Sequence, residues 1–185
     1  MGVSPLTPGN RAVFLDRDGV VNHAIIRERK PFPPANVSEL VINRDAIIGL
    51  PLLKRLGFLL VVVTNQPDVR RGSTSIDTVR RIHDAIRSEL PIDDFFICCH
   101  DDHDGCDCRK PLPGLLLSAA TRYDIQLDDS FLIGDRWRDI DAGYRAGVQT
   151  ALIDYGYEER GPDHEPDIRV KSLLQAVQWI TAERQ

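Results

Sequence analysis

Short apolar runs rich in β-branched or aromatic residues alternate along the chain with segments of helical spacing. The runs predict buried strands at residues 12–15, 58–63, 94–98, 131–133 and 150–153. The segments around them predict helices at residues 45–56, 76–90 behind a Ser75 cap, 113–123, 140–146 and 172–183. Strands that alternate with helices form a parallel sheet, because each crossover needs a connection of helical length. We therefore expect an α/β fold with a parallel sheet sandwiched by helices.

The remaining segments set the expected organisation of the chain. Its 185 residues correspond to about one domain of ordinary size. Residues 1–10 contain two prolines and no apolar periodicity, which predicts a flexible lead-in before a single domain at residues 11–185. Residues 23–37 predict a long irregular segment after the first strand, and Pro51 should kink or break the helix predicted around it.

Charge and hydropathy narrow the class of function. Lys and Arg number 23 and Asp and Glu number 28, and the resulting net charge of −5 argues against a broad nucleic-acid-binding surface. The longest apolar run, residues 58–63, is much shorter than the roughly 18 residues that a membrane span needs. No basic and apolar leader opens the sequence, which predicts a cytoplasmic protein. We also expect a monomer that binds neither nucleic acid nor membrane.

Polar side chains follow three of the predicted strands at the point where each strand ends. The first strand runs directly into Asp16 and Asp18, which by themselves could be a pair of turn residues. Further along the chain come a hydroxyl, two amides, two acids and, before a predicted helix, a lysine: Thr64, Asn65, Gln66, Asp135, Asp139 and Lys110. The carboxyl ends of parallel strands meet at one edge of a sheet, so we expect these groups to converge on a ligand site.

This ordered set of residues resembles the four motifs of the haloacid dehalogenase superfamily of phosphatases over residues 12–153. The resemblance implies a Rossmann-like fold with minimal cap elements over the site. It also implies that Asp16 is a nucleophile that forms an aspartyl-phosphate, and that Asp18 protonates the leaving oxygen and then activates water. Thr64 and Lys110 are expected to orient and neutralise the phosphoryl oxygens.

The same resemblance implies a magnesium ion, since a hard cation has to offset the repulsion between a carboxylate and a phosphate dianion. Asp16, Asp135 and Asp18, the last through its backbone carbonyl, are the expected ligands, and Asp139 is expected to support the ion from behind them. We expect five residues near the motifs to contact the substrate: Arg17, Asn65, Gln66, Arg109 and Arg136. Arg70, Arg71 and Arg138 are expected to be solvated surface charges.

All four cysteines of the chain fall within residues 98–108. Clustering of this kind in a chain without an export signal favours a metal site over a disulfide framework. Zinc prefers four nitrogen and sulfur ligands in a closed tetrahedron, and this segment can supply them as Cys98, His100, Cys106 and Cys108. We expect a structural zinc ion that fastens the loop and so places Arg109 and Lys110.

Two residues of the same segment are left outside this set. Cys99 follows Cys98 on a predicted strand and is expected to face away from it and pack as a small apolar side chain. His103 is expected to be a solvated loop residue, although it could replace one of the ligands.

The zinc ligands and the Arg109-Lys110-Pro111 segment that follows are further similar to a zinc-containing branch of the superfamily. This branch holds D-glycero-D-manno-heptose 1,7-bisphosphate phosphatases and histidinol-phosphate phosphatases. Residues 64–66, 71–72 and 109–114 look more like the heptose enzymes, whereas the short gap between His100 and Cys106 fits the histidinol-phosphate enzymes comparably well. Residues 23–37 are basic here, where the heptose enzymes commonly carry an acidic substrate loop, so they either contact a second phosphate or are solvated.

We therefore expect magnesium-dependent hydrolysis of a small phosphorylated metabolite. Heptose 1,7-bisphosphate, cleaved at its 7-phosphate, is the first choice of substrate, and histidinol phosphate is the alternative within the same class. An alternative of a different class is a zinc-stabilised binding module that has lost turnover. The presence of every motif residue argues against that module.

Overall fold

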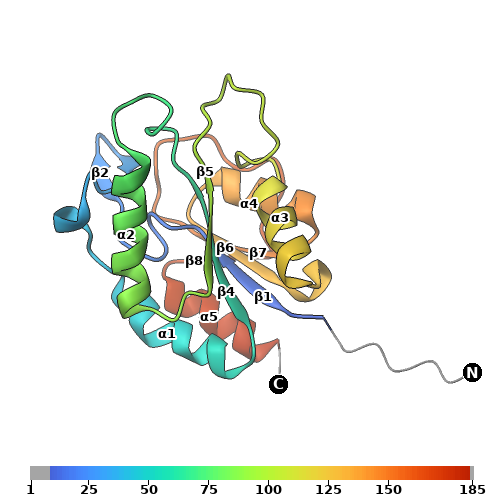
Figure 1. The fold of residues 1–185 in the computed structure, drawn as a ribbon. Helices are drawn as coiled ribbons and strands as arrows, with labels where there is room; N and C mark the ends of the chain where they lie inside the picture. The colour runs from blue at the N-terminus through green and yellow to red at the C-terminus, as the bar shows by residue number, and fades with distance from the viewer. Residues whose placement is uncertain (1–8, 184–185) are drawn as a thin grey trace, which may run out of the picture.

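The computed structural model describes residues 9–183, and residues 1–8 of the predicted lead-in lie outside the described part. Its main sheet contains β1 (Ala12–Leu15), β4 (Leu59–Asn65), β5 (Asp94–Cys98), β6 (Phe131–Gly134), β7 (Gln149–Ile153) and β8 (Ile168–Val170). The strands are all parallel and lie in the order β5-β4-β1-β6-β7-β8 (Figure 1). The chain reverses its direction of travel across the sheet between β1 and β6, and ligands of such folds bind at that switch point.

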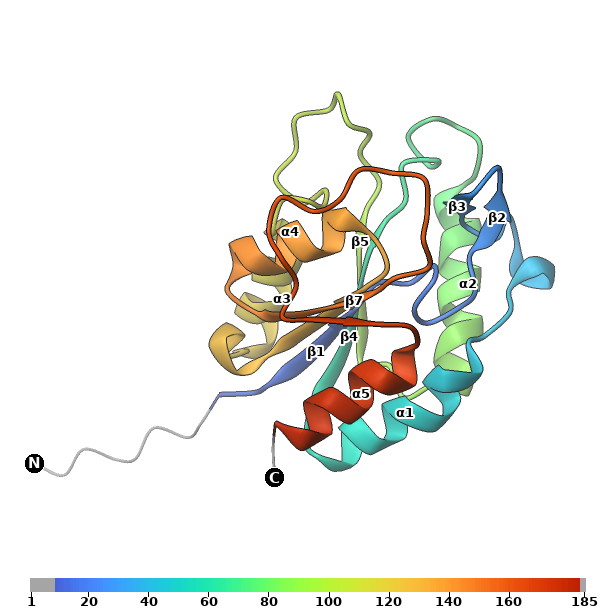
Figure 2. The ribbon, with the colours of Figure 1, turned by 180° about the vertical axis from the view of Figure 1, so that it is seen from behind.

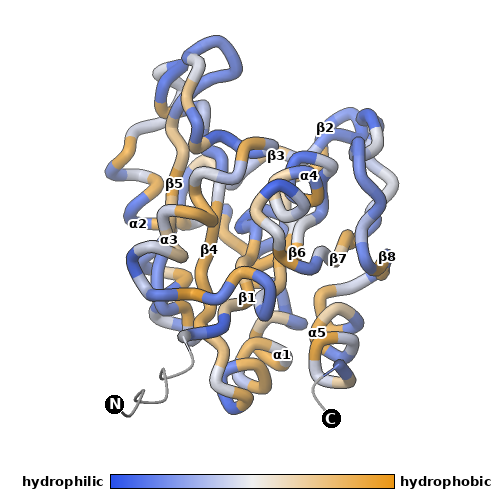
Figure 3. The backbone as a smooth tube through the Cα atoms, turned by 90° about the vertical axis from the view of Figure 1, so that its right-hand side faces the viewer, coloured by the Kyte–Doolittle hydropathy of each residue, from blue (hydrophilic) through white to orange (hydrophobic). Residues whose placement is uncertain are grey.

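Helices cover both faces of the sheet, which confirms the predicted α/β sandwich (Figure 2). One face packs against α1 (Arg44–Arg55), α2 (Ile76–Glu89) and α5 (Leu173–Ala182). The other face packs against α3 (Gly114–Tyr123) and α4 (Trp137–Ala146). Because both faces are buried, the central strand β1 is apolar along its whole length, whereas the loops beyond the carboxyl ends of the strands are mostly hydrophilic (Figure 3).

Residues 23–37 are more regular than the sequence predicts. They contain an antiparallel hairpin of β2 (Ile25–Arg27) and β3 (Lys30–Phe32), followed by a short 3-10 helix at Val37–Glu39. The two turn residues, Glu28 and Arg29, both have positive φ angles of 49° and 60°. A two-residue turn of this kind usually contains Asn or Gly. This turn contains neither residue, which explains why the sequence did not predict the hairpin.

The helix around Pro51 runs without a break from Arg44 to Arg55, so the predicted break is wrong. Pro51 removes one hydrogen bond from the helix, but the helix gains tertiary contacts that offset this loss. Its buried residues include Ala46, Leu50 and Leu53, and Gly49 allows close contact with Val177 of α5. Packing against α5 therefore overrides the local effect of the proline.

Side-chain caps fix the start of three helices. The Asn43, Ser75 and Ser172 side chains each accept a backbone N–H of the first helical turn, which confirms the cap predicted at Ser75. The α4 helix begins at Trp137, three residues before the predicted start at residue 140, and this brings Asp139 into its first turn.

Among residues 9–183, no helix is long and apolar enough to cross a membrane.

The cap at Ser75 gives a test of how α2 is held. We expect Ser75→Ala to lower the free energy of unfolding by about 1 kcal/mol, because the Thr78 N–H loses its side-chain acceptor. Urea denaturation followed by circular dichroism measures this change. Ser88→Ala in the last turn of α2 is the matched control, with an expected change within about 0.5 kcal/mol; equal losses for both variants would contradict the capping role.

Candidate active site

Three buried carboxylates meet at the switch point of the sheet. Asp16 directly follows β1, Asp135 directly follows β6, and Asp139 lies in the first turn of α4. Each of them offers a carboxylate oxygen, and these oxygens all lie within 4.8 Å of one another. The three strand and helix ends thus converge as the sequence predicts.

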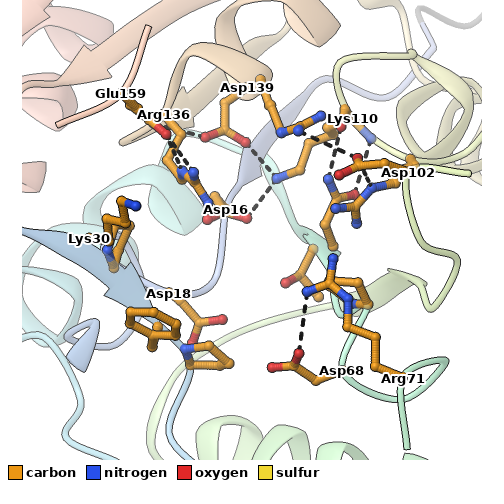
Figure 4. Close-up of a pocket in the computed structure, with 18 of the residues that line it drawn as sticks. Asp16, Asp18, Lys30, Asp68, Arg71, Asp102, Lys110, Arg136, Asp139 and Glu159 are labelled. Carbon is orange, nitrogen blue, oxygen red and sulfur yellow. Dashed lines mark hydrogen bonds and ion pairs between the residues drawn. The ribbon is translucent and has the colours of Figure 1, made fainter. Parts of the chain in front are cut away.

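Lys110 is the counter-ion of this group. Its Nζ donates to Asp16 Oδ1 and to Asp139 Oδ1, both at 2.6 Å, and to the backbone carbonyl of Val63 at 2.7 Å (Figure 4). Burial by itself lowers the pKa of Lys110, but the carboxylates of Asp139 and Asp16 more than offset this and raise it above its ordinary value. Lys110 is therefore a fixed positive charge in the site.

One lysine leaves the three carboxylates short of positive charge. Burial raises the pKa of Asp16 to about 6, although Lys110 opposes this rise, and burial raises the pKa of Asp135 well above its usual range. Asp135 Oδ2 accepts a hydrogen bond from the Tyr157 hydroxyl at 2.9 Å, whereas the buried Oδ1 has no partner among the described residues. A set of oxygen ligands with an orphaned carboxylate oxygen fits a divalent cation such as Mg²⁺.

Gly19 is required for this cluster to form. Its φ angle is +96°, and a Cβ atom at this position would lie 1.9 Å from Asp135 Oδ2. Only glycine permits both the backbone conformation and the close approach of Asp135. The turn that carries Asp18 can therefore pack against Asp135 at the end of β6 only with glycine at position 19.

Asp18 lies beside the carboxylate cluster and is held by four donors. Its Oδ1 accepts from Arg17 Nε at 3.1 Å and Asn22 Nδ2 at 3.0 Å, and its Oδ2 accepts from Arg17 Nη2 at 2.8 Å and Gln66 Nε2 at 3.0 Å. Gln66 Nε2 also contacts Thr64 Oγ1 at 2.9 Å. Asp18 has to give up one of these hydrogen bonds whenever it takes up a proton.

Two of the residues predicted to contact the substrate are not among the residues that line the pocket. Arg17 is 0% exposed and Gln66 is 2% exposed, and both bind Asp18 instead. Burial of this degree does not fit the substrate contact predicted for them. Asn65 lines the pocket, but its amide group bonds both backbone groups of Lys110, at 2.9 Å and 3.1 Å, so it fixes the loop that carries the lysine.

A pocket of about 370 Å³ opens above the carboxylates (Figure 4). Apart from Lys110, the positively charged side chains that line it are Lys30, Arg71, Arg109, Arg136 and Arg138. The predicted contacts of Arg109 and Arg136 with a ligand are compatible with these positions. Arg71 and Arg138 also line the pocket, which the sequence did not predict, whereas Arg70 pairs with Asp104 and is not among the lining residues.

Acidic neighbours hold the pocket arginines in place. Arg109 Nε donates to Asp102 Oδ1 at 2.8 Å, and Arg138 pairs with the same carboxylate at 3.4 Å. Arg136 Nε donates to Glu159 at 3.0 Å. These contacts restrict the side chains before any ligand arrives.

Two short segments form the outer wall of the pocket. The β2–β3 hairpin contributes Lys30 and Phe32, and the segment between β7 and β8 contributes Glu158 and Glu159. This second segment also supplies Tyr157 to Asp135. The sequence analysis assigned it no role, because its residues show neither periodicity nor motif spacing. Lys30 favours the substrate-contact alternative for the basic segment 23–37.

The four predicted zinc ligands come together beyond β5. The sulfur atoms of Cys98, Cys106 and Cys108 lie 3.2–3.8 Å apart, and His100 Nδ1 lies 3.3 Å from Cys108 Sγ. Zinc–sulfur bonds of about 2.3 Å in a tetrahedron place sulfur atoms about 3.8 Å apart, so the cluster can hold zinc. Cys99 is outside this cluster, and so is the exposed His103.

Comparison with known proteins places this site in a family. A family model described as HAD-hydrolase-like matches residues 107–176. The D-glycero-beta-D-manno-heptose-1,7-bisphosphate 7-phosphatase of Helicobacter pylori strain J99 is 31% identical, over 92% of this chain and 97% of its own length. The D-glycero-alpha-D-manno-heptose-1,7-bisphosphate 7-phosphatase of Burkholderia mallei is 37% identical, over 78% of this chain and 79% of its own length.

A solved structure agrees with these relatives. The crystal structure of D,D-heptose 1.7-bisphosphate phosphatase from Bordetella bronchiseptica, complexed with magnesium and phosphate, superposes with a TM-score of 0.76. It is 28% identical in sequence, and the alignment covers 94% of this chain and 99% of that one. The fold and the acidic site at its switch point are thus those of a haloacid dehalogenase-type hydrolase. The chain belongs to this family, in the branch that contains the heptose bisphosphate phosphatases.

The cysteine cluster gives a direct prediction. Protein purified without chelator should contain about one zinc ion per chain, measured by inductively coupled plasma mass spectrometry. Cys106→Ser should lose most of the zinc and part of the activity, because Arg109 and Lys110 follow the cluster directly. Cys99→Ser is the matched control and should keep its zinc, since Cys99 lies outside the cluster. A folded wild-type protein without zinc would contradict the assignment.

Proposed function

We propose that this chain is a magnesium-dependent phosphatase that removes the 7-phosphate of D-glycero-D-manno-heptose 1,7-bisphosphate. The observation that carries the proposal is the buried group of Asp16, Asp135 and Asp139, which faces Lys110 at the floor of a pocket lined with cations. The names of the relatives supply the substrate.

Asp16 is the nucleophile in this proposal. Its carboxylate oxygen forms a bond to phosphorus while the bond from phosphorus to the sugar oxygen breaks, and an aspartyl-phosphate results. Magnesium held by Asp16, Asp135 and the Asp18 carbonyl would neutralise negative charge at the phosphoryl group. Lys110 and Thr64 orient the phosphoryl oxygens, and Asp139 keeps Lys110 in place through their 2.6 Å ion pair.

Asp18 exchanges protons in both halves of the reaction. It gives a proton to the sugar oxygen as that oxygen leaves, and it then removes a proton from the water that attacks the aspartyl-phosphate. Its place in the pocket lining, next to Asp16, supports this role. The same geometry argues against a binding module without turnover, because the nucleophile, the lysine and the proton-exchange residue are all present together.

The pocket has positively charged side chains beyond Lys110, and acidic neighbours pair with most of them. Lys110 serves the inner phosphoryl site, while Lys30, Arg109 and Arg136 line the same pocket and can meet a second phosphate. Histidinol phosphate carries an ammonium group and an imidazole ring and has no second phosphate. These cations therefore favour the heptose bisphosphate over histidinol phosphate.

A side-by-side assay tests the proposal. We expect phosphate release with Mg²⁺ to give a kcat/KM at least ~10²-fold higher for heptose 1,7-bisphosphate than for histidinol phosphate, which corresponds to about 2.7 kcal/mol of transition-state binding. Asp16→Asn is the blank, and it should fold normally and abolish turnover. The opposite preference would assign the histidinol-phosphate branch, and no release from either ester or from an aryl phosphate would refute phosphatase function.

The arginines of the pocket should differ from those outside it. We expect Arg109→Ala to raise KM by about tenfold, because a guanidinium that meets phosphate oxygens is lost. Arg70→Ala is the matched control, since Arg70 is paired with Asp104 outside the pocket, and its KM should change less than about twofold. Steady-state kinetics on the heptose substrate measures both values, and the reverse order would mean that Arg109 does not bind substrate.

Magnesium affinity should fall in acid. The pKa of Asp16 is raised to about 6 and that of Asp135 is raised as well, so protons compete with the metal below this pH. We expect the dissociation constant for Mg²⁺ to rise at least about tenfold between pH 7 and pH 5, measured by isothermal titration calorimetry. Asp135→Asn should abolish binding and the exposed Asp84→Asn should leave it unchanged; a constant affinity across this range would contradict the assigned ligands.

A further inference from the structure

Arg17 is a fully buried arginine beside the active site, with 0% of its surface exposed. Its Nε and Nη2 donate to the two oxygens of Asp18, at 3.1 Å and 2.8 Å, as a two-point fork. Among residues 9–183, Asp18 is the only carboxylate that forms an ion pair with it. A buried guanidinium without its anion is strongly unfavourable, so Arg17 and Asp18 are bound to each other by burial as well as by geometry.

His83 supports this arginine from the side opposite Asp18. The His83 ring comes from the buried face of α2, and its Nε2 lies 3.2 Å from Arg17 Nη1. Burial, followed by the neighbouring Arg17, lowers the pKa of His83 to about 3, so the ring is neutral and Nε2 accepts the hydrogen bond. The ring also stacks on Phe95 of β5, with centroids 4.2 Å apart, which fixes its plane.

Four residues form a chain of contacts that runs from β5 to the pocket. Phe95 fixes His83, His83 accepts from Arg17, and Arg17 grips both oxygens of Asp18, which lines the pocket. The fork restricts rotation of the Asp18 carboxylate more than a single hydrogen bond would. Neither Arg17 nor His83 is among the residues that line the pocket, so neither reaches a substrate directly.

We propose that Arg17 and His83 are positioning residues that hold the Asp18 carboxyl group in line with the leaving oxygen of the substrate. This inference rests on the proposed phosphatase function and on the proton-exchange role of Asp18 within it. In the first half of the reaction, the electron pair of the breaking phosphorus–oxygen bond stays on the sugar oxygen, which takes the proton from Asp18. A misplaced Asp18 slows displacement of a leaving oxygen that needs this proton, whereas the contacts that hold Asp16 against Lys110 stay unchanged.

The leaving group separates this role from a merely structural one. A sugar alcohol is a poor leaving group and needs the proton from Asp18, whereas p-nitrophenolate leaves readily without one. The ratio kcat/KM reports only the steps up to departure of the leaving group, before the shared aspartyl-phosphate is hydrolysed. A positioning defect therefore affects kcat/KM for the sugar phosphate selectively.

His83→Phe is the direct test, because phenylalanine keeps the ring beside Phe95 and removes the acceptor for Arg17. We expect kcat/KM for heptose 1,7-bisphosphate to fall by about tenfold or more, and that for p-nitrophenyl phosphate to fall by less than about threefold. His83→Gln restores an acceptor and should recover most of the loss. Arg17→Gln is a second variant, with the same selective loss expected, in case His83→Phe does not fold.

Val79→Ala is the matched control, one turn before His83 on the same buried face of α2. It should lower the melting temperature without changing the ratio between the two substrates. An equal loss on both substrates in His83→Phe and Arg17→Gln, or no loss on either, would overturn the inference while the phosphatase function stands. A wild-type protein that releases phosphate from neither substrate would overturn both.

Discussion

The buried ion pairs of Lys110 with Asp16 and Asp139 are the interaction on which the rest of the site depends. A buried ammonium group is tolerated only when its charge is compensated, and here it is compensated by side chains from two different segments. The lysine thereby ties the loop before α3 to the end of β1 and the start of α4. It also leaves the acidic cluster with unmatched negative charge, which makes the site a place for a divalent cation.

The cysteine and histidine cluster at the end of β5 acts on the same lysine from a distance. Cys108 lies two residues before Lys110, so a zinc ion held by this cluster would fix the backbone that delivers the ammonium group. Asn65 fixes that backbone a second time from the end of β4. The Lys110 ammonium group is thus held in place by the end of β4, by the loop before α3 and by the cysteine and histidine cluster. It contacts Asp16 in this arrangement without any movement of these parts.

Much of this arrangement could be predicted from the sequence, because it follows from chain direction and spacing. Asp16 and Asp135 converge because they follow neighbouring parallel strands, and the spacing of the four zinc ligands fits a closed site. The orientation of Arg17 could not be predicted, since it depends on His83, which is distant in sequence and gives no motif signal. Tyr157 was missed for a similar reason, because a lone tyrosine in an irregular segment becomes meaningful only through its contact with Asp135.

The outer wall of the pocket has a consequence for how the site responds to salt. It consists of a hairpin with three residues in each strand and an irregular segment, joined by the ion pair between Arg29 and Glu158. Both side chains of that pair are more than half exposed, so dissolved ions screen it, and they screen the exposed Lys30 of the same hairpin as well. The attachment between the hairpin and the segment therefore weakens as ionic strength rises, whereas the buried ion pairs of Lys110 below it are shielded from the surrounding salt.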